Sequence, residues 1–278
     1  ESSCNLIQLE NAQNNGDVTV KRLGSKLKKL DYTLWSSPVK GTQTMLEFSP
    51  ATLVNRFYYY NTPTSNYFPV TSPATATFTT AKGYIIRMPN EITGPQATAY
   101  NNGGYRFRFE GIFKGTPNNG NVYIPLTYVD AAHAYNGVGN PYPSPISITD
   151  FIDANIDNID GTIWIWRKTN NPNETSYCTA TKAGYVANNA LGGGGTGGND
   201  GNDLVVDPWT INNEGVLNTG QGFIVKATTN QNLVFRNNMR LSDNYTNFFR
   251  NGEDTNVEPV TNTISRIWIN VSNAAEDV

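Results

Sequence analysis

The chain has 278 residues, of which 15% are charged and 12% are aromatic, and its formal net charge is −3. A net negative charge provides no overall attraction for nucleic acid. No apolar run approaches the roughly 20 residues that a membrane-spanning helix needs, so we expect neither nucleic-acid binding nor membrane insertion.

The residue types favour β-structure along most of the chain. Thr, Tyr, Ile and Val pack well on a pleated sheet, while Asn, together with 25 Gly and 15 Pro, supplies the turns between strands. Long amphipathic helical patterns are nearly absent. We therefore predict an all-β protein with sandwich-type antiparallel sheets.

The first segment, residues 1–30, contains short alternating runs and the turn signal Asn14-Asn15-Gly16. Asn-Gly is typical of a hairpin turn. We expect this segment to be a lead-in hairpin or the end of a preceding element.

Residues 31–128 and 129–250 repeat one order of features, which predicts an internal duplication. In each, an opening turn is followed by an aromatic strand and then by a strand that begins with Gly. We expect two pseudo-duplicated β units with long loops, the second packed on the first. Strands of the first unit are predicted at 32–35, 56–60, 76–79, 83–88, 105–113 and 121–128.

The second unit departs from a plain strand pattern in two places. Residues 148–156 are predicted to form a short helix with Thr149 or Asp150 as its N-cap. Residues 192–203 are mostly Gly, Asn and Asp and are expected to form a surface loop.

The last segment, residues 251–278, contains a strand-like run at 266–271 and an acidic terminus. We expect one more strand followed by a frayed end. Because this strand has no partner after it, we expect the native polypeptide to continue beyond the chain.

Two strand-like runs concentrate aromatic side chains. Tyr58 and Tyr60 are separated by one residue, as are Trp164 and Trp166. Side chains alternate across a strand, so each pair shares a face. If that face is exposed, these four residues are candidates for sugar binding; coverage by a second sheet is the commoner alternative.

Catalytic patterns are weak. His133 is the only histidine, and a Ser-His-Asp site would have to use it. No Gly-x-Ser-x-Gly motif is present, so we expect a structural or surface role for His133. Glycoside cleavage needs two facing carboxylates, and the glutamates Glu47, Glu91, Glu110 and Glu174 are scattered. We expect no catalytic residues, with a glycoside hydrolase-like enzyme as the alternative.

Calcium is the one ion that the sequence suggests. Asp200 and Asp203 lie in a glycine-rich segment that partly matches a calcium-binding repeat. Such repeats work as stacked copies and only one is present, so a flexible linker is favoured and a calcium site is the alternative. No other cofactor is expected.

Asp153, Asn155 and Asp157 alternate as oxygen ligands do in a calcium loop. The twelfth position of that loop is Trp164 instead of Glu, so the EF-hand interpretation fails. Cys4 and Cys178 are the only cysteines, and the sequence does not decide whether they pair.

A resemblance to a known family rests on a set of short motifs spread between Gly16 and Val271. The chain resembles the large secreted surface proteins of gliding and related Bacteroidota that are exported by the type IX secretion system. The motifs are Trp35-Ser36-Ser37-Pro38, Val138-Gly139-Asn140-Pro141-Tyr142-Pro143-Ser144-Pro145, Asp160-Gly161-Thr162-Ile163-Trp164, Gly220-Gln221-Gly222-Phe223, Phe235-Arg236-Asn237-Asn238-Met239-Arg240 and Phe248-Phe249-Arg250.

The resemblance implies a secreted, adhesin-like β module at the outer-membrane surface or outside the cell, with no catalytic residues to transfer. The implied partners are the type IX secretion machinery, through regions outside this chain, and surface glycans or other copies of the protein. A polysaccharide-binding or polysaccharide-degrading protein and a calcium-stabilised fibre segment are the alternatives.

Overall fold

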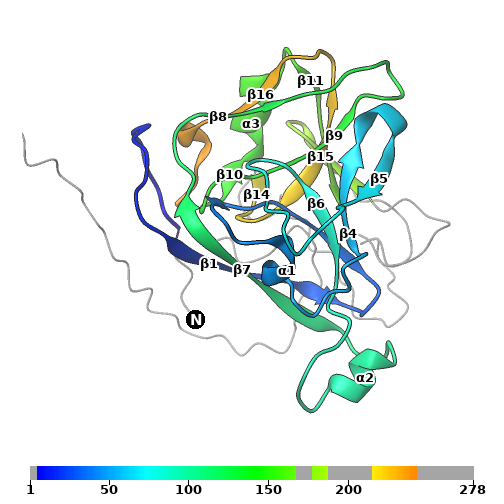
Figure 1. Ribbon diagram of the computed structural model, residues 1–278. Coiled ribbons are helices and arrows are strands. Elements are labelled where there is room, and N and C mark those ends of the chain that lie inside the picture. The colour runs from blue at the N-terminus through cyan, green and yellow to red at the C-terminus, as the bar shows by residue number, and fades with distance from the viewer. Residues whose placement is uncertain (1–4, 167–176, 187–214, 243–278) are drawn as a thin grey trace, which may run out of the picture.

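The structure is a computed structural model that describes residues 5–166, 177–186 and 215–242 (Figure 1). Strands dominate these residues and the helices are short, which confirms the all-β, sandwich-type prediction. No helix in this part of the chain is long and apolar enough to cross a membrane. The helices are α1 (Met45–Phe48), α2 (Ala97–Asn101), α3 (Ile148–Asn155) and the 3-10 turns Thr62–Thr64 and Asn237–Met239.

The strands form several antiparallel sheets. Their bounds are β1 (Val18–Leu27), β2 (Tyr32–Trp35), β3 (Val39–Lys40), β4 (Phe57–Asn61), β5 (Asn66–Pro69), β6 (Tyr84–Arg87), β7 (Phe107–Pro117), β8 (Val122–Pro125), β9 (Tyr135–Gly139), β10 (Ile146–Ser147), β11 (Ile159–Trp166), β12 (Tyr177–Thr181), β13 (Gly184–Val186), β14 (Val216–Leu217), β15 (Gly222–Ala227) and β16 (Asn232–Phe235).

The two largest sheets share one strand order. The first is β2-β6-β4-β5, and the second is β9-β15-β11-β12 with β13 added at its edge. A flanking pair accompanies each sheet, because β1 pairs with β7 and β8 pairs with β16. We therefore call β1–β7 the first unit and β8–β16 the second unit.

The register of strand pairing recurs as well. A residue pair in one sheet has a counterpart at the equivalent position of the other, so the likeness extends from topology to single residues. Equivalent pairs are Tyr32–Arg87 and Tyr135–Lys226, Phe57–Ile86 and Ile163–Val225, and Tyr60–Tyr67 and Trp166–Tyr177.

The two units contact each other through reciprocal backbone hydrogen bonds. The Ser36 amide donates to the Gly220 carbonyl at 2.9 Å, and the Gly139 amide donates to the Ala81 carbonyl at 2.8 Å. In each case the end of the first strand of one sheet meets the residue that leads into the last strand of the other. Each unit thus donates a backbone hydrogen bond to the equivalent position of the other.

Glycine is required where these strands meet. A Cβ atom on Gly83 would lie 2.7 Å from the Val138 carbonyl oxygen, and one on Gly222 would lie 2.8 Å from Leu34 Cγ. Both distances are shorter than a Cβ atom tolerates, so the close approach explains the Gly directly before β6 and the Gly at the start of β15.

Two boundaries differ from the sequence prediction. Residues 5–17 contain no strand, and β1 pairs along its length with β7, so the expected hairpin within residues 1–30 is wrong. Strand β8 ends before residue 128 but pairs with β16, which places it with the second unit instead of the first. Both strands pair with partners distant in sequence, and a local sequence pattern does not predict such pairing.

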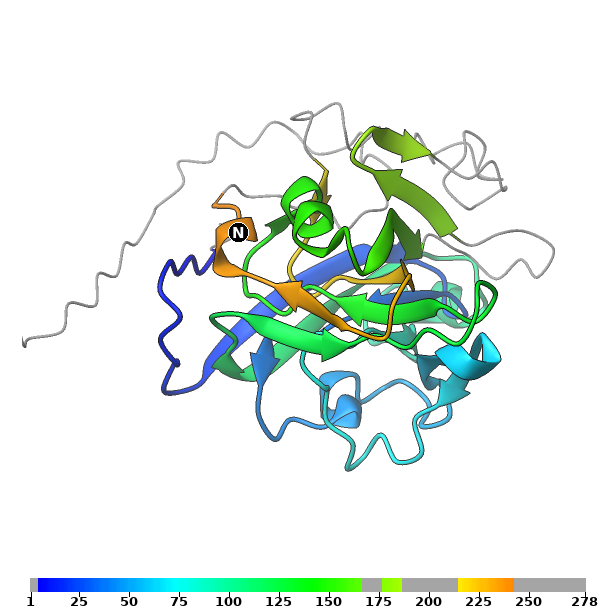
Figure 2. The same ribbon diagram turned by 90° about the horizontal axis from the view of Figure 1, so that it is seen from above.

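Residues 76–79, predicted to be a strand, form only an isolated bridge between Thr77 and Thr44. The predicted short helix is confirmed as α3, but its N-cap is Ser147, whose side chain accepts a hydrogen bond from the Asp150 amide at 3.1 Å. Figure 2 shows α3 lying against β16.

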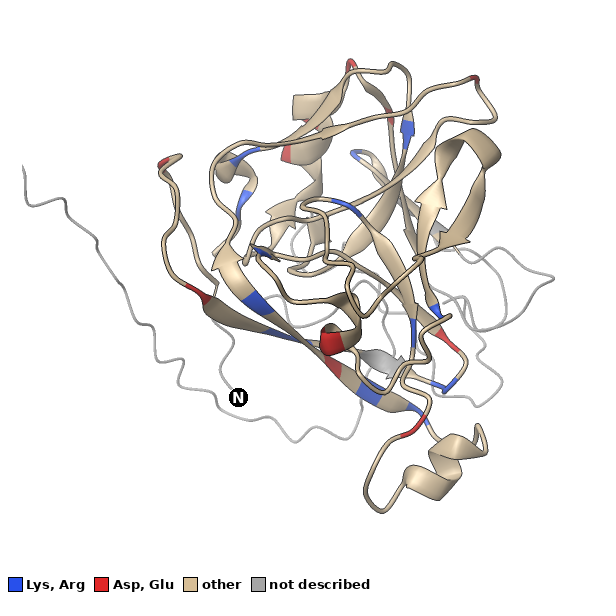
Figure 3. Cartoon of the chain, viewed as in Figure 1, with Lys and Arg blue, Asp and Glu red and all other residues tan. Residues whose placement is uncertain are grey.

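Each unit has its own apolar core. Trp35, Phe48 and Phe113 are central in the first, and Phe151, Phe223 and Phe235 are central in the second. A third cluster lies between the two large sheets. Charged residues are sparse along the described part of the chain, as Figure 3 shows.

Candidate functional site

The third cluster contains the four aromatic residues that the sequence marks for ligand binding. Tyr58, Tyr60, Trp164 and Trp166 come from strands β4 and β11 and are all half-buried. They pack with Leu34, Ile85, Ile224, Tyr32, Tyr67, Tyr135 and Tyr177. The structure therefore brings all four into one half-buried cluster, which we call the aromatic cluster.

A continuous row of ring contacts crosses the cluster. The Tyr60 and Tyr67 ring centroids are 5.2 Å apart, Tyr67 and Trp166 are 6.2 Å apart, and Trp166 and Tyr177 are 5.2 Å apart, all edge to face. Edge-to-face pairs of this kind are favourable beyond the area they bury. The row passes from the first unit to the second.

Hydrogen bonds reinforce this junction. The Tyr67 and Tyr177 hydroxyl groups lie 2.6 Å apart. Trp166 Nε1 donates to the Tyr32 carbonyl at 3.0 Å, and Thr62 Oγ1 donates to the Tyr135 carbonyl at 2.6 Å. Tyr32 and Tyr135 are equivalent residues, so each unit supplies a donor to the same position of the other.

The environment of the two hydroxyl groups disfavours ionisation. Burial raises the pKa of Tyr67 well above its ordinary value, and the neighbouring Tyr177 raises it further. Burial also raises the pKa of Tyr177. Both phenols are therefore neutral hydrogen-bonding groups at physiological pH.

At each end of the cluster lies a pair of aromatic rings with a cation nearby. Tyr32 and Tyr58 have ring centroids 6.1 Å apart, and Tyr135 and Trp164 have centroids 5.2 Å apart. The Lys226 ammonium lies 5.5 Å from the Tyr135 ring centroid, within the range of a cation–π contact.

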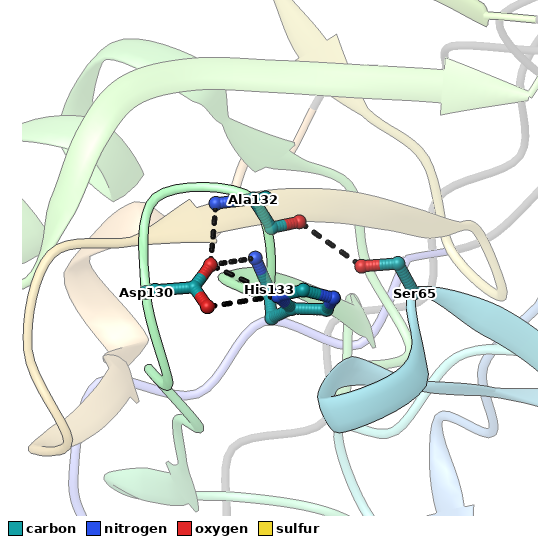
Figure 4. A network of polar contacts seen from close by, with 4 residues as sticks. All are labelled: Ser65, Asp130, Ala132 and His133. Carbon is teal, nitrogen blue, oxygen red and sulfur yellow. Dashed lines mark hydrogen bonds and ion pairs between the residues drawn. The ribbon is translucent and has the colours of Figure 1, made fainter.

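His133 lies in an exposed turn (Figure 4). Its Nδ1 is 2.9 Å from Asp130 Oδ1, and Asp130 also accepts hydrogen bonds from the Ala132 and His133 amides. The nearby Ser65 hydroxyl donates to the Ala132 carbonyl at 3.0 Å. Because this serine proton is directed to a backbone carbonyl, the group closes a turn and does not form a Ser-His-Asp relay.

The hydrogen bonds from His133 and from the two amides lower the pKa of Asp130. A carboxylate that accepts several hydrogen bonds is stabilised in its charged form. Asp130 is therefore held as an ionised cap of the turn, which is a structural use of the acid.

Of the two calcium-type patterns in the sequence, the structure describes only the one at residues 153–157. Asp200 and Asp203 lie outside the described residues. Asn155 is buried: its Nδ2 donates to the Phe151 and Val234 carbonyls, and its Oδ1 accepts from the Val234 amide. Asn155 thus fastens α3 to β16. No group of three potential metal ligands occurs within the ranges that the structure describes.

Of the acidic candidates that the structure describes, Glu47 and Glu110 have partners other than His133. Glu47 Oε2 accepts from the Thr44 amide at 2.7 Å in the capping box of α1. Glu110 lies 3.6 Å from Lys21 Nζ across strands β1 and β7. Cys4 and the side chain of Cys178 lie outside what the structure describes, so their pairing stays a question from sequence.

Several residues of the cluster were not marked by the sequence analysis. In the sequence, Tyr67 and Tyr177 each follow a run of polar residues, which gives no sign of a buried position. The usable signal was the duplication: Tyr67 and Tyr177 hold equivalent positions opposite the predicted Tyr60 and Trp166.

Comparison with known proteins identifies a family whose function is unknown. A family model described as a domain of unknown function (DUF8693) matches residues 1–278. Neither a curated protein nor a solved structure is detectably similar to the chain.

Proposed function

The chain belongs to the DUF8693 family of domains of unknown function, and we propose that it is a non-catalytic binding and structural module of a secreted surface protein. The aromatic cluster carries the proposal. Its rings and hydroxyl groups join two equivalent units into one body, which suits a module that holds a shape and presents a fixed surface.

The proposed role is adhesin-like. Function on a rigid β scaffold depends on surface side chains and not on the fold itself. At the end of the aromatic cluster in the first unit, the half-buried Tyr58 ring lies beside Arg56, whose Nη1 donates to the Tyr58 hydroxyl. Surface glycans or another copy of the protein are the partners that we propose for such a surface.

The proposed location is extracellular or at the outer-membrane surface, after export by the type IX secretion system. The support is the resemblance of the sequence motifs to type IX secreted surface proteins, together with the low content of charged residues. Contact with the secretion machinery would use regions outside this chain.

A glycan array with the purified chain tests the proposal when it is combined with an assay for new reducing ends on the same polysaccharides. We expect saturable binding to a subset of glycans without release of reducing ends. Release that is lost in Asp130→Asn or His133→Ala would replace the proposal with a polysaccharide-degrading enzyme. Binding to no glycan and no self-association would also overturn it.

Thermal melts with and without a calcium chelator test the remaining alternative. A calcium-stabilised fibre segment requires that a chelator lowers the melting temperature, because a ligand that binds only the folded state stabilises it. An unchanged melting temperature is the expected result for a module held together by the aromatic cluster.

A further inference from the structure

Arg87, the last residue of β6, lies beside Arg56, the residue directly before β4. The Arg87 amide donates to the Arg56 carbonyl at 3.1 Å, one step beyond the Phe57–Ile86 pair. Because side chains alternate along a strand, Arg87 shares a face with Ile85 of the aromatic cluster. Like charges directly opposite each other in a sheet are unfavourable.

No carboxylate in the described part of the chain forms a salt bridge with either arginine. Arg56 Nη1 donates to the Tyr58 hydroxyl at 3.2 Å and to the Asn55 carbonyl at 3.1 Å, and Arg87 Nη2 donates to Asn90 Oδ1 at 3.2 Å. The contacts hold the guanidinium groups in place without neutralising their charge.

Arg87 is only 7% exposed, and its buried Nε has no hydrogen-bond partner. A buried donor without a partner is costly. Burial lowers the pKa of Arg87, and the nearby Arg56 contributes in the same direction. The first unit thus holds two neighbouring cations that have no carboxylate partner among the described residues.

Two phenol rings border the pair. Tyr32 is opposite Arg87 in the register of β2 and β6, and Tyr58 orients Arg56 through its hydroxyl group. Both rings are half-buried. Guanidinium groups bind carboxylate and sulfate groups in a bidentate manner, and an adjacent ring offers an apolar face to a sugar.

The second unit has the same strand pairing but only one of the two cations. Lys226 is equivalent to Arg87 and lies over the Tyr135 ring, while Thr162 occupies the position equivalent to Arg56, directly before Ile163. The cationic pair is therefore a feature of the first unit alone, and Lys226 supplies a matched control.

We propose that Arg56, Arg87, Tyr32 and Tyr58 form a binding site for an acidic sugar, a carboxylate-bearing or sulfated residue of a polysaccharide. This inference rests on the proposed binding function and names its ligand class. The two guanidinium groups bind the anionic group, and the two phenol rings contact the sugar ring.

Calorimetric titration of the whole chain with an oligogalacturonate, a sulfated heparin-type oligosaccharide and a neutral oligosaccharide tests the site. We expect binding of at least one acidic ligand, no binding of the neutral one, and weakening with added salt. The two acidic arms distinguish carboxylate from sulfate recognition. For Arg56→Gln and for Arg87→Gln we expect the affinity to fall by about tenfold or more, because each variant removes a charge-assisted contact. For Lys226→Gln we expect an unchanged affinity.

Thermal melts separate a binding role from a structural one. Arg56→Gln removes like-charge repulsion, so its melting temperature should equal or exceed that of the wild type while its affinity for the acidic ligand falls. Equal affinity of Arg56→Gln and wild type, an equal loss in Lys226→Gln, or no binding of either acid would overturn the site. Binding of neutral glycans alone would overturn it and leave the proposed function standing, whereas release of reducing ends would overturn the function.

Discussion

The hydroxyl groups of Tyr67 and Tyr177 lie 2.6 Å apart, although the two residues are 110 positions apart in the chain. They occupy equivalent positions in the two units, opposite Tyr60 and Trp166. A contact between equivalent residues of two like units is what a two-fold relation between them produces. This hydrogen bond therefore joins the two units at equivalent positions.

Removal of that hydrogen bond should lower the stability of the whole chain. We expect Tyr67→Phe and Tyr177→Phe each to reduce the free energy of unfolding by about 1 kcal/mol. The double variant should cost less than the sum of the two, because both changes remove the same bond. Urea denaturation measures all three, with Tyr123→Phe as an exposed control; additive losses would contradict the shared bond.

Alkaline pH should destabilise the protein through the same two phenols. Their pKa values are raised in the folded state, so above about pH 10 the unfolded chain releases protons that the folded chain retains. The stabilisation is present below that pH and is lost as the pH rises further. Denaturant melts between pH 8 and pH 11 measure the decline, which should be smaller in the double phenylalanine variant; an equal decline would show that other groups cause it.

Ala81 and Gly220 occupy equivalent positions, with φ angles of +62° and +77°. A residue with a Cβ in this left-handed region costs roughly 1–2 kcal/mol. We expect Gly220→Ala to lower the free energy of unfolding by about that amount, since its Cβ would also lie 3.2 Å from Phe113.

Ala81→Gly is the reciprocal variant. Relief of backbone strain opposes the greater flexibility of glycine in the unfolded chain, so we expect a much smaller change. Thermal denaturation compares the two. A larger loss in Ala81→Gly than in Gly220→Ala would contradict the assigned equivalence.

Asn155 should be essential for stability and not for ion binding. Asn155→Ala leaves the Val234 amide and carbonyl without the partners they have on α3, and each such loss costs about 1–3 kcal/mol. We expect a loss of about 2 kcal/mol or more, independent of calcium. Asp157→Asn, at an exposed position of the same motif, is the control. Rescue of Asn155→Ala by calcium would contradict this assignment.

The fold class followed from the sequence because its signals are local. Alternation of apolar residues placed β2, β4 and β6 close to their observed bounds, and the turn residues separated them. The short helix α3 was predicted from the same kind of signal. The predicted caps, Thr149 and Asp150, lie two and three residues beyond the observed cap Ser147, since helix ends are the least distinct part of a pattern.

The candidate site required information that a local pattern lacks. Alternation predicted that Tyr58 and Tyr60 share a face, but not that this face meets Trp164 and Trp166 of the other unit. Strands β1 and β8 were assigned to the wrong neighbours for the same reason: each pairs with a strand far along the chain. The opposition of Arg56 and Arg87 depends on a register that only the paired sheet defines.

Differential scanning calorimetry of the whole chain tests most directly that the aromatic cluster makes one body of two units. We predict one transition for the wild type, with equal calorimetric and van't Hoff enthalpies, and a broadened or divided transition when Trp166→Ala is combined with Tyr67→Ala. Two separate transitions in the wild type, or an unaltered single transition in the double variant, would contradict the account.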